Sequence, residues 1–201
     1  MIKAMGLTGR SLIVLFWLLA LTGAPAAEIG LESAGARGSG NPASTNGLFR
    51  LESIGVRGGF SANESGAEFN QAEVAANFDL PWRWNAGAEW GLQTRLDLSL
   101  GWLGSSSDNA FIGTLGPSLI LERKGFPLSL EGGVSPTLLS KHDLGAKNFG
   151  TKFQFTSHIG LNWDIASRVR LSYRFQHMSN AHLSEHNPGL NLYMLGISYL
   201  F

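Results

Sequence analysis

The sequence predicts an all-β protein, specifically an eight-stranded antiparallel transmembrane β-barrel. Three observations indicate this fold class: segments of about ten residues in which apolar and polar side chains alternate, a composition rich in glycine and aromatic residues, and an N-terminal export sequence. The 201-residue chain contains 26 Gly, 12 Phe and 6 Trp, but only 15% charged residues. This composition suits tight strands with aromatic anchors better than a helical bundle.

The N-terminal segment has the features of a secretory signal. The positively charged residues Lys3 and Arg10 precede an apolar run at residues 12–21, and the small residues of Ala24-Pro25-Ala26 follow it. The run is too short for a membrane-spanning helix, which needs roughly 20 apolar residues. We therefore predict a cleaved signal peptide at residues 1–26, a flexible lead-in rich in Gly, Ser, Ala and Asn at residues 27–50, and the barrel at residues 51–201.

The alternation of side chains defines the expected strands. It is clearest at residues 90–102, 153–165, 170–176 and 193–201, and weaker at residues 53–60, 72–80, 111–122 and 128–135. The polar face is small and rich in glycine, and it carries Arg95, Asp97, Asp164 and Arg174. A soluble sandwich would need far more surface charge, whereas a narrow barrel interior can be filled by paired charges.

Aromatic residues and the C-terminus point to the cell outer membrane. Aromatic side chains recur near strand ends, as expected for interfacial girdles, at Trp82, Trp84, Trp90, Trp102, Trp163 and Tyr199. The alternating terminal segment that ends in Phe201 is typical of bacterial outer-membrane barrels. The formal charge of zero argues against a nucleic acid partner, since phosphate binding needs a basic surface.

A group of polar residues lies where the strand pattern predicts contact with lipid. In such a barrel both termini are periplasmic, so the segment after the seventh strand is extracellular. Extending the parity of Tyr173 and Phe175 places His177 and Ser179 on the lipid-facing side, and Asn191 reaches the same side on the last strand. A serine, an imidazole and a third polar group can form a nucleophilic site. The alternative is a set of interfacial polar residues without catalysis.

The residues around this group resemble a known family. The run Tyr173-Arg174-Phe175-Gln176-His177-Met178-Ser179-Asn180-Ala181, followed by Asn187-Pro188-Gly189-Leu190-Asn191 and a strand ending in Phe201, resembles the PagL family of lipid A 3-O-deacylases. The resemblance implies an eight-stranded barrel that hydrolyses the ester-linked acyl chain at position 3 of lipid A, the membrane anchor of lipopolysaccharide. It also implies that His177 is the base, that Ser179 is the nucleophile, and that Asn180 with nearby backbone amides stabilises the oxyanion.

The third member of the site departs from the family pattern. Asn191 stands where the best-known members of the family have Glu. Asparagine can orient an imidazole but cannot balance the charge of an imidazolium, although the site also resembles the Ser-His-Asn arrangement of outer-membrane phospholipase A. Glu185 is the alternative acid, ranked second because a loop positions a group less well than a strand does.

The sequence is also compatible with two other functions, and it contains a metal-binding pattern. The alternatives are an outer-membrane phospholipase and a non-enzymatic structural barrel, and a homodimer is left open. Residues 182–186 match a His-x-x-Glu-His zinc pattern that works only on a helix, and Asn187-Pro188-Gly189 interrupts a helix at once. We therefore expect no metal and no cofactor.

Overall fold

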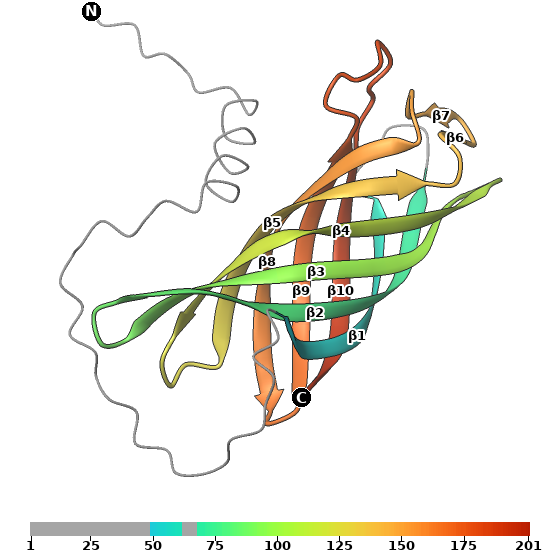
Figure 1. Cartoon of the computed structure of the whole chain (residues 1–201). Helices are drawn as coiled ribbons and strands as arrows, with labels where there is room; N and C mark the ends of the chain where they lie inside the picture. Colours follow the sequence, from blue (N-terminus) through green and yellow to red (C-terminus); the bar gives the residue numbers. More distant parts are fainter. Residues whose placement is uncertain (1–48, 62–67) are drawn as a thin grey trace, which may run out of the picture. The chain divides into compact units, whose positions relative to one another are not determined.

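A computed structural model shows a closed barrel of eight antiparallel strands (Figure 1). It describes residues 49–61 and 68–201, so the predicted signal peptide and nearly all of the predicted lead-in lie outside the described residues. The barrel strands are β1 (Arg50–Ser61), β2 (Phe69–Ala86), β3 (Trp90–Ser105), β4 (Asn109–Arg123), β5 (Leu128–Leu139), β8 (Phe153–Ala166), β9 (Val169–Ser179) and β10 (Leu190–Leu200). The predicted fold class is confirmed, with β1 beginning one residue before the expected start of the barrel.

Consecutive strands pair around the barrel, and β1 closes it against β10. A two-stranded hairpin of β6 (Asp143–Leu144) and β7 (Lys147–Asn148), which the sequence pattern did not predict, lies in the connection between β5 and β8. No helix within the described ranges has the length and hydropathy needed to cross a membrane.

The two ends of the barrel differ in their connections. Short turns at residues 87–89, 124–127 and 167–168 lie at the end where the C-terminus also lies. Two longer connections lie at the opposite end, and we call them the β5–β8 loop (residues 140–152) and the β9–β10 loop (residues 180–189). Since both termini of such a barrel are periplasmic, these loops belong to the extracellular end.

The outer surface of the barrel is apolar, as the alternation predicts. Large apolar side chains exposed on the outward face include Val56, Val74, Leu100, Leu115, Ile159, Leu161, Leu195 and Ile197. Trp82, Trp84 and Trp90 are exposed toward the periplasmic end, and Trp102 contacts Phe111 near the extracellular end, with ring centroids 5.7 Å apart. These aromatic residues match the predicted girdles at the two membrane interfaces.

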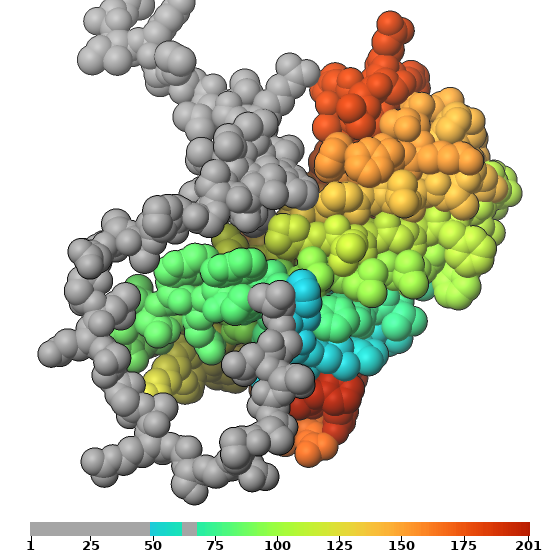
Figure 2. Space-filling view, in the orientation of Figure 1, coloured from blue at the N-terminus to red at the C-terminus, as the bar shows by residue number. Residues whose placement is uncertain are grey.

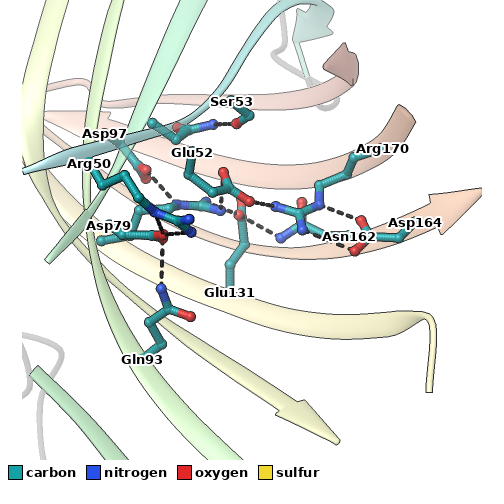
Figure 3. A network of polar contacts seen from close by, with 12 residues as sticks. Arg50, Glu52, Ser53, Asp79, Gln93, Asp97, Glu131, Asn162, Asp164 and Arg170 are labelled. Carbon is teal, nitrogen blue, oxygen red and sulfur yellow. Dashed lines mark hydrogen bonds and ion pairs between the residues drawn. The ribbon is translucent and has the colours of Figure 1, made fainter. Parts of the chain in front are cut away.

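Paired charges fill the middle of the barrel (Figure 3). Glu131 accepts from Arg95 at 2.7 Å and pairs with Arg174 at 2.6 Å, while Arg95 also bonds Asp97 at 3.0 Å. All four side chains are buried, because inward-facing positions on β3, β5 and β9 meet across the narrow interior. The expectation of a charge-filled interior is therefore confirmed for these residues.

Asp164 keeps the predicted inward parity, but it lies at the mouth of the interior and not in its buried middle. Asp164 lies at the periplasmic rim, where its side chain is 41% exposed and pairs with Arg170 at 2.5 Å (Figure 3). Arg170 in turn bonds Glu52 at 2.6 Å. The register of β8 against β9 is regular through Asp164 and becomes irregular only between Asp164 and Ala166, at the turn, so the exposure of Asp164 reflects the open end of the barrel.

A cluster of apolar side chains occupies the extracellular end of the interior. We call this cluster the plug, and it comprises Phe69, Leu103, Ala110, Ile112, Leu139, Leu144, Phe149, Met178, Leu190, Leu192 and Met194. Leu144 and Phe149 come from the β5–β8 loop, which folds over the end of the barrel and packs against inward-facing residues of the strands. Burial of these side chains fixes the loop to the barrel wall.

The buried charge network predicts a large effect of removing one partner. Replacing Glu131 by Gln leaves Arg95 and Arg174 without their shared carboxylate, and we expect a loss of about 3–5 kcal/mol in the free energy of unfolding. Urea unfolding of the refolded barrel, followed by tryptophan fluorescence, measures this loss. Glu89→Gln is the matched control, since Glu89 pairs with Arg123 on the exposed surface and its loss changes stability by about 1 kcal/mol or less. Equal losses in both variants would contradict the prediction.

Candidate active site

The predicted site residues meet on the outward face of one hairpin at the extracellular end. His177 and Ser179 occupy alternate positions at the end of β9, so both share the outward side with Phe175. Asn191, near the start of β10, is the direct cross-strand partner of His177. The structure therefore brings His177, Ser179 and Asn191 onto one patch of the lipid-facing surface, as the strand pattern predicts.

A hydrogen bond joins the imidazole of His177 to the amide of Asn191. The distance from Nδ1 to the side-chain oxygen Oδ1 is 2.7 Å. A carbonyl oxygen only accepts, so Nδ1 of His177 carries the hydrogen in this bond. In the neutral ring Nε2 then has a free lone pair, which is the protonation state that a general base requires.

Ser179 is half-buried beside this imidazole. It pairs across the sheet with Phe155 on β8, and its backbone ends the regular part of β9. The structure contains no hydrogen bond between the side chains of the described residues Ser179 and His177. Positions two apart on a strand are separated by about 6.6 Å, with side chains on the same face, so the hydroxyl group and the ring are neighbours on the outward surface.

Gly189 supports the other side of the His177 ring, and the sequence analysis did not single it out. Its φ of +65° is a backbone conformation that favours glycine, and an added Cβ would lie 3.0 Å from Cε1 of His177 and 3.6 Å from Nε2. The β9–β10 loop thus passes close to the ring only because residue 189 has no side chain. Its place next to Pro188 was the one signal in the sequence.

Asn180 has a different environment from the one that was predicted. Its side chain is fully buried, and Nδ2 donates to the carbonyl oxygens of Phe149 at 2.9 Å and His186 at 2.7 Å. Its backbone N–H donates to Oδ1 of Asn187 at 3.0 Å. Because both side-chain hydrogens and the backbone N–H are already used, these bonds oppose the prediction that Asn180 binds an oxyanion.

The alternative acid and the zinc pattern lie away from this arrangement. Glu185 is exposed in the β9–β10 loop, and among the described residues its carboxylate forms no hydrogen bond with His177. His182 and His186 are also exposed in this loop, which is not helical. Within residues 49–61 and 68–201, no cluster of three or more His, Cys, Asp or Glu side chains could hold a metal ion.

Comparison with known proteins decides the family. The model of the family described as lipid A 3-O-deacylase (PagL) matches residues 70–200, a range that includes every residue of the site. The chain belongs to the PagL family. Lipid A deacylase PagL of Bordetella bronchiseptica is 32% identical to it over 139 residues, which cover 64% of this chain and 75% of the relative.

The crystal structure of the outer membrane enzyme PagL has the same fold. It superposes with a TM-score of 0.61 at 20% identity and covers 72% of this chain and 97% of that chain. Membership in the PagL family makes the protein a carboxylic ester hydrolase of the outer membrane. It also decides against the non-enzymatic barrel and for lipid A deacylation over the phospholipase.

The contact between Gly189 and His177 predicts a selective loss of activity. In Gly189→Ala the new methyl group presses on the imidazole, and we expect deacylation to fall by about 10- to 100-fold, as for other small displacements of catalytic groups. Lipid A hydrolysis by the purified, refolded enzyme measures the effect. Gly87→Ala is the matched control, because Gly87 has φ +66° but nothing within 4 Å of an added Cβ. If both variants lose the same activity, displacement of His177 is not the cause.

Proposed function

We propose that Ser179 is the nucleophile, His177 the general base and Asn191 the orienting group in hydrolysis of the acyl ester at position 3 of lipid A. The observation that carries this proposal is the 2.7 Å bond between His177 and Asn191, which leaves Nε2 free on the face that Ser179 shares. Membership in the PagL family supplies the substrate and the type of reaction.

In the proposed mechanism Nε2 of His177 takes the proton of the Ser179 hydroxyl as Oγ attacks the ester carbonyl carbon. The bond between that carbon and the sugar oxygen then breaks, and the imidazolium returns the proton to the leaving sugar oxygen. Water, activated by the same imidazole, hydrolyses the acyl-enzyme and releases the fatty acid. Asn191 holds Nδ1 throughout, so the ring keeps one tautomer and one orientation.

The surroundings of the site support a substrate that stays in the membrane. Polar side chains are costly against lipid, so a cluster of three at this level calls for a role. Below them on the same outward face lie aromatic side chains, with the rings of Phe175 and Tyr193 5.4 Å apart and those of Tyr173 and Tyr193 6.2 Å apart. Acyl chains in the outer leaflet contact this apolar surface while the ester lies at the height of Ser179.

One prediction of this mechanism concerns the two reacting side chains. Ser179→Ala and His177→Ala should each lower deacylation by about 10⁴-fold or more, because members of such a site act as a unit. Mass spectrometry of lipid A from cells that express each variant measures the product. Ser157→Ala is the matched control, since Ser157 is the cross-strand neighbour of His177 and its hydroxyl group donates only to the backbone carbonyl oxygen of His177, at 3.4 Å. Normal deacylation in Ser179→Ala would exclude the proposal.

Another prediction of this mechanism concerns the side-chain amide of Asn191. Asn191→Ala should lower the rate by about five-fold, since the lost hydrogen bond is worth about 1 kcal/mol. Asn191→Asp, of the same shape, should raise it by about five-fold, because a carboxylate also balances the imidazolium charge. Initial rates on lipid A in mixed micelles test both, with Glu185→Gln as the control that leaves the rate unchanged. If Glu185→Gln were the slow variant, the third role would move to that residue.

The homodimer that the sequence left open stays a prediction. Crosslinking of the enzyme in its native membrane, with the band at twice the mass of one chain as the expected product, tests it.

A further inference from the structure

Asn180 joins three parts of the chain immediately after the nucleophile. Its two side-chain hydrogens go to the carbonyl oxygens of Phe149 in the β5–β8 loop and His186 in the β9–β10 loop. Its backbone N–H goes to Asn187, and its Oδ1 accepts from the N–H of His182 at 2.9 Å. The residue that directly follows Ser179 is therefore fully buried and held by four hydrogen bonds.

The backbone next to this residue adopts a conformation that needs such support. Ala181 has φ +51° and His182 has φ +65°, both in the left-handed region that residues other than glycine rarely occupy. Strained residues of this kind persist only where the surroundings hold them. The bond from His182 to Asn180 closes the turn, so Asn180 maintains the reversal of the chain directly beyond Ser179.

The Phe149 end of the link is anchored in the plug. The Phe149 side chain is 1% exposed and packs edge-on against Phe69 with ring centroids 6.0 Å apart. Its carbonyl oxygen also accepts from Gln154, another fully buried amide, at 3.3 Å. Nζ of Lys147 lies 5.7 Å from the Phe69 ring and 6.0 Å from the Phe149 ring. The acceptor that Asn180 uses is thus held by the packed interior of the barrel.

The two loops also touch beyond this bond. An added Cβ at Gly150 would meet both Ser184 and the carbonyl oxygen of His186, so the β5–β8 loop lies directly against the β9–β10 loop. Figure 2 shows the red residues of the β9–β10 loop next to orange residues from the region where the β5–β8 loop leads into β8. The two loops are therefore packed directly against each other.

We propose that Asn180 is a positioning residue. Its hydrogen bond to the carbonyl group of Phe149 ties the end of β9 to the plug and so holds Ser179 in place for attack. The inference rests on the proposed function of Ser179. It assigns a part in catalysis to the β5–β8 loop, which precedes β8 in the sequence and supplies none of the proposed reacting groups. The Phe149 carbonyl group then does more than stabilise the loop, because its bond to Asn180 also affects the rate of the chemical step.

Kinetics of single and double variants test the link. Asn180→Ala removes the donor, and Phe149→Ala loosens the acceptor by emptying its place in the plug. Each should lower kcat by about ten-fold or more with KM changed by less than about two-fold, since substrate binding does not involve either residue. In the double variant the losses should not multiply, because either change alone already breaks the connection.

Leu103→Ala is the matched control for loss of packing. Leu103 is a fully buried plug residue on β3, and the plug loses volume without a change at the Phe149 carbonyl. Its effect on kcat should stay below about two-fold and be the same with Asn180 present or absent. Tm values, and the fraction of folded barrel from the heat-dependent shift on gels, correct every rate for stability.

A second variant covers failure of Asn180→Ala to fold. Asn180→Asp has the same shape and keeps the acceptor for His182, but it lacks the two donors, and it should show the same loss in kcat. A kcat within about two-fold of wild type in Asn180→Asp or Asn180→Ala, or multiplying losses in the double variant, would overturn the inference. Ser179→Ala is measured alongside, and activity in that variant would overturn the proposed function instead.

Discussion

Lipid offers no hydrogen bonds to a polypeptide backbone, and this constraint governs the whole molecule. Each backbone N–H and C=O group in the membrane has to pair with a neighbouring strand, which leads to a closed barrel. Closure in turn divides the side chains by a period of two, one facing lipid and the next facing the interior. The same rule that places Arg174 among buried charges therefore places Tyr173 and His177 outside.

Much of the fold and site follows from this period and is open to prediction from sequence. The alternation at residues 90–102 and 193–201 locates β3 and β10, and its extension assigns His177, Ser179 and Asn191 to one face. The bond between His177 and Asn191 needs one further fact, the register of β9 against β10, which the period of two limits to shifts that keep each side chain on its face.

The features that the sequence did not predict lie in the loops, where the alternation of inward and outward side chains ends. Gly189 and Asn180 belong to a loop, and no local pattern encodes their contacts with His177 and Phe149, although the family resemblance had already named Asn180. The plug has the same origin. Its members occupy inward positions that look like ordinary barrel interior, and their apolar character makes sense only with Leu144 and Phe149 folded over them. A two-residue strand such as β6 is too short to have a measurable period.

In the proposed mechanism the outward position of Ser179, His177 and Asn191 also decides how a substrate arrives. A lipid reaches this face by sliding within its own leaflet, in two dimensions and without passing through water or through the barrel. The quantity that saturates such an enzyme is the number of lipids per unit area of membrane, not their amount per volume of solution. Crowding and fluidity of the leaflet then belong to its kinetics as directly as temperature does.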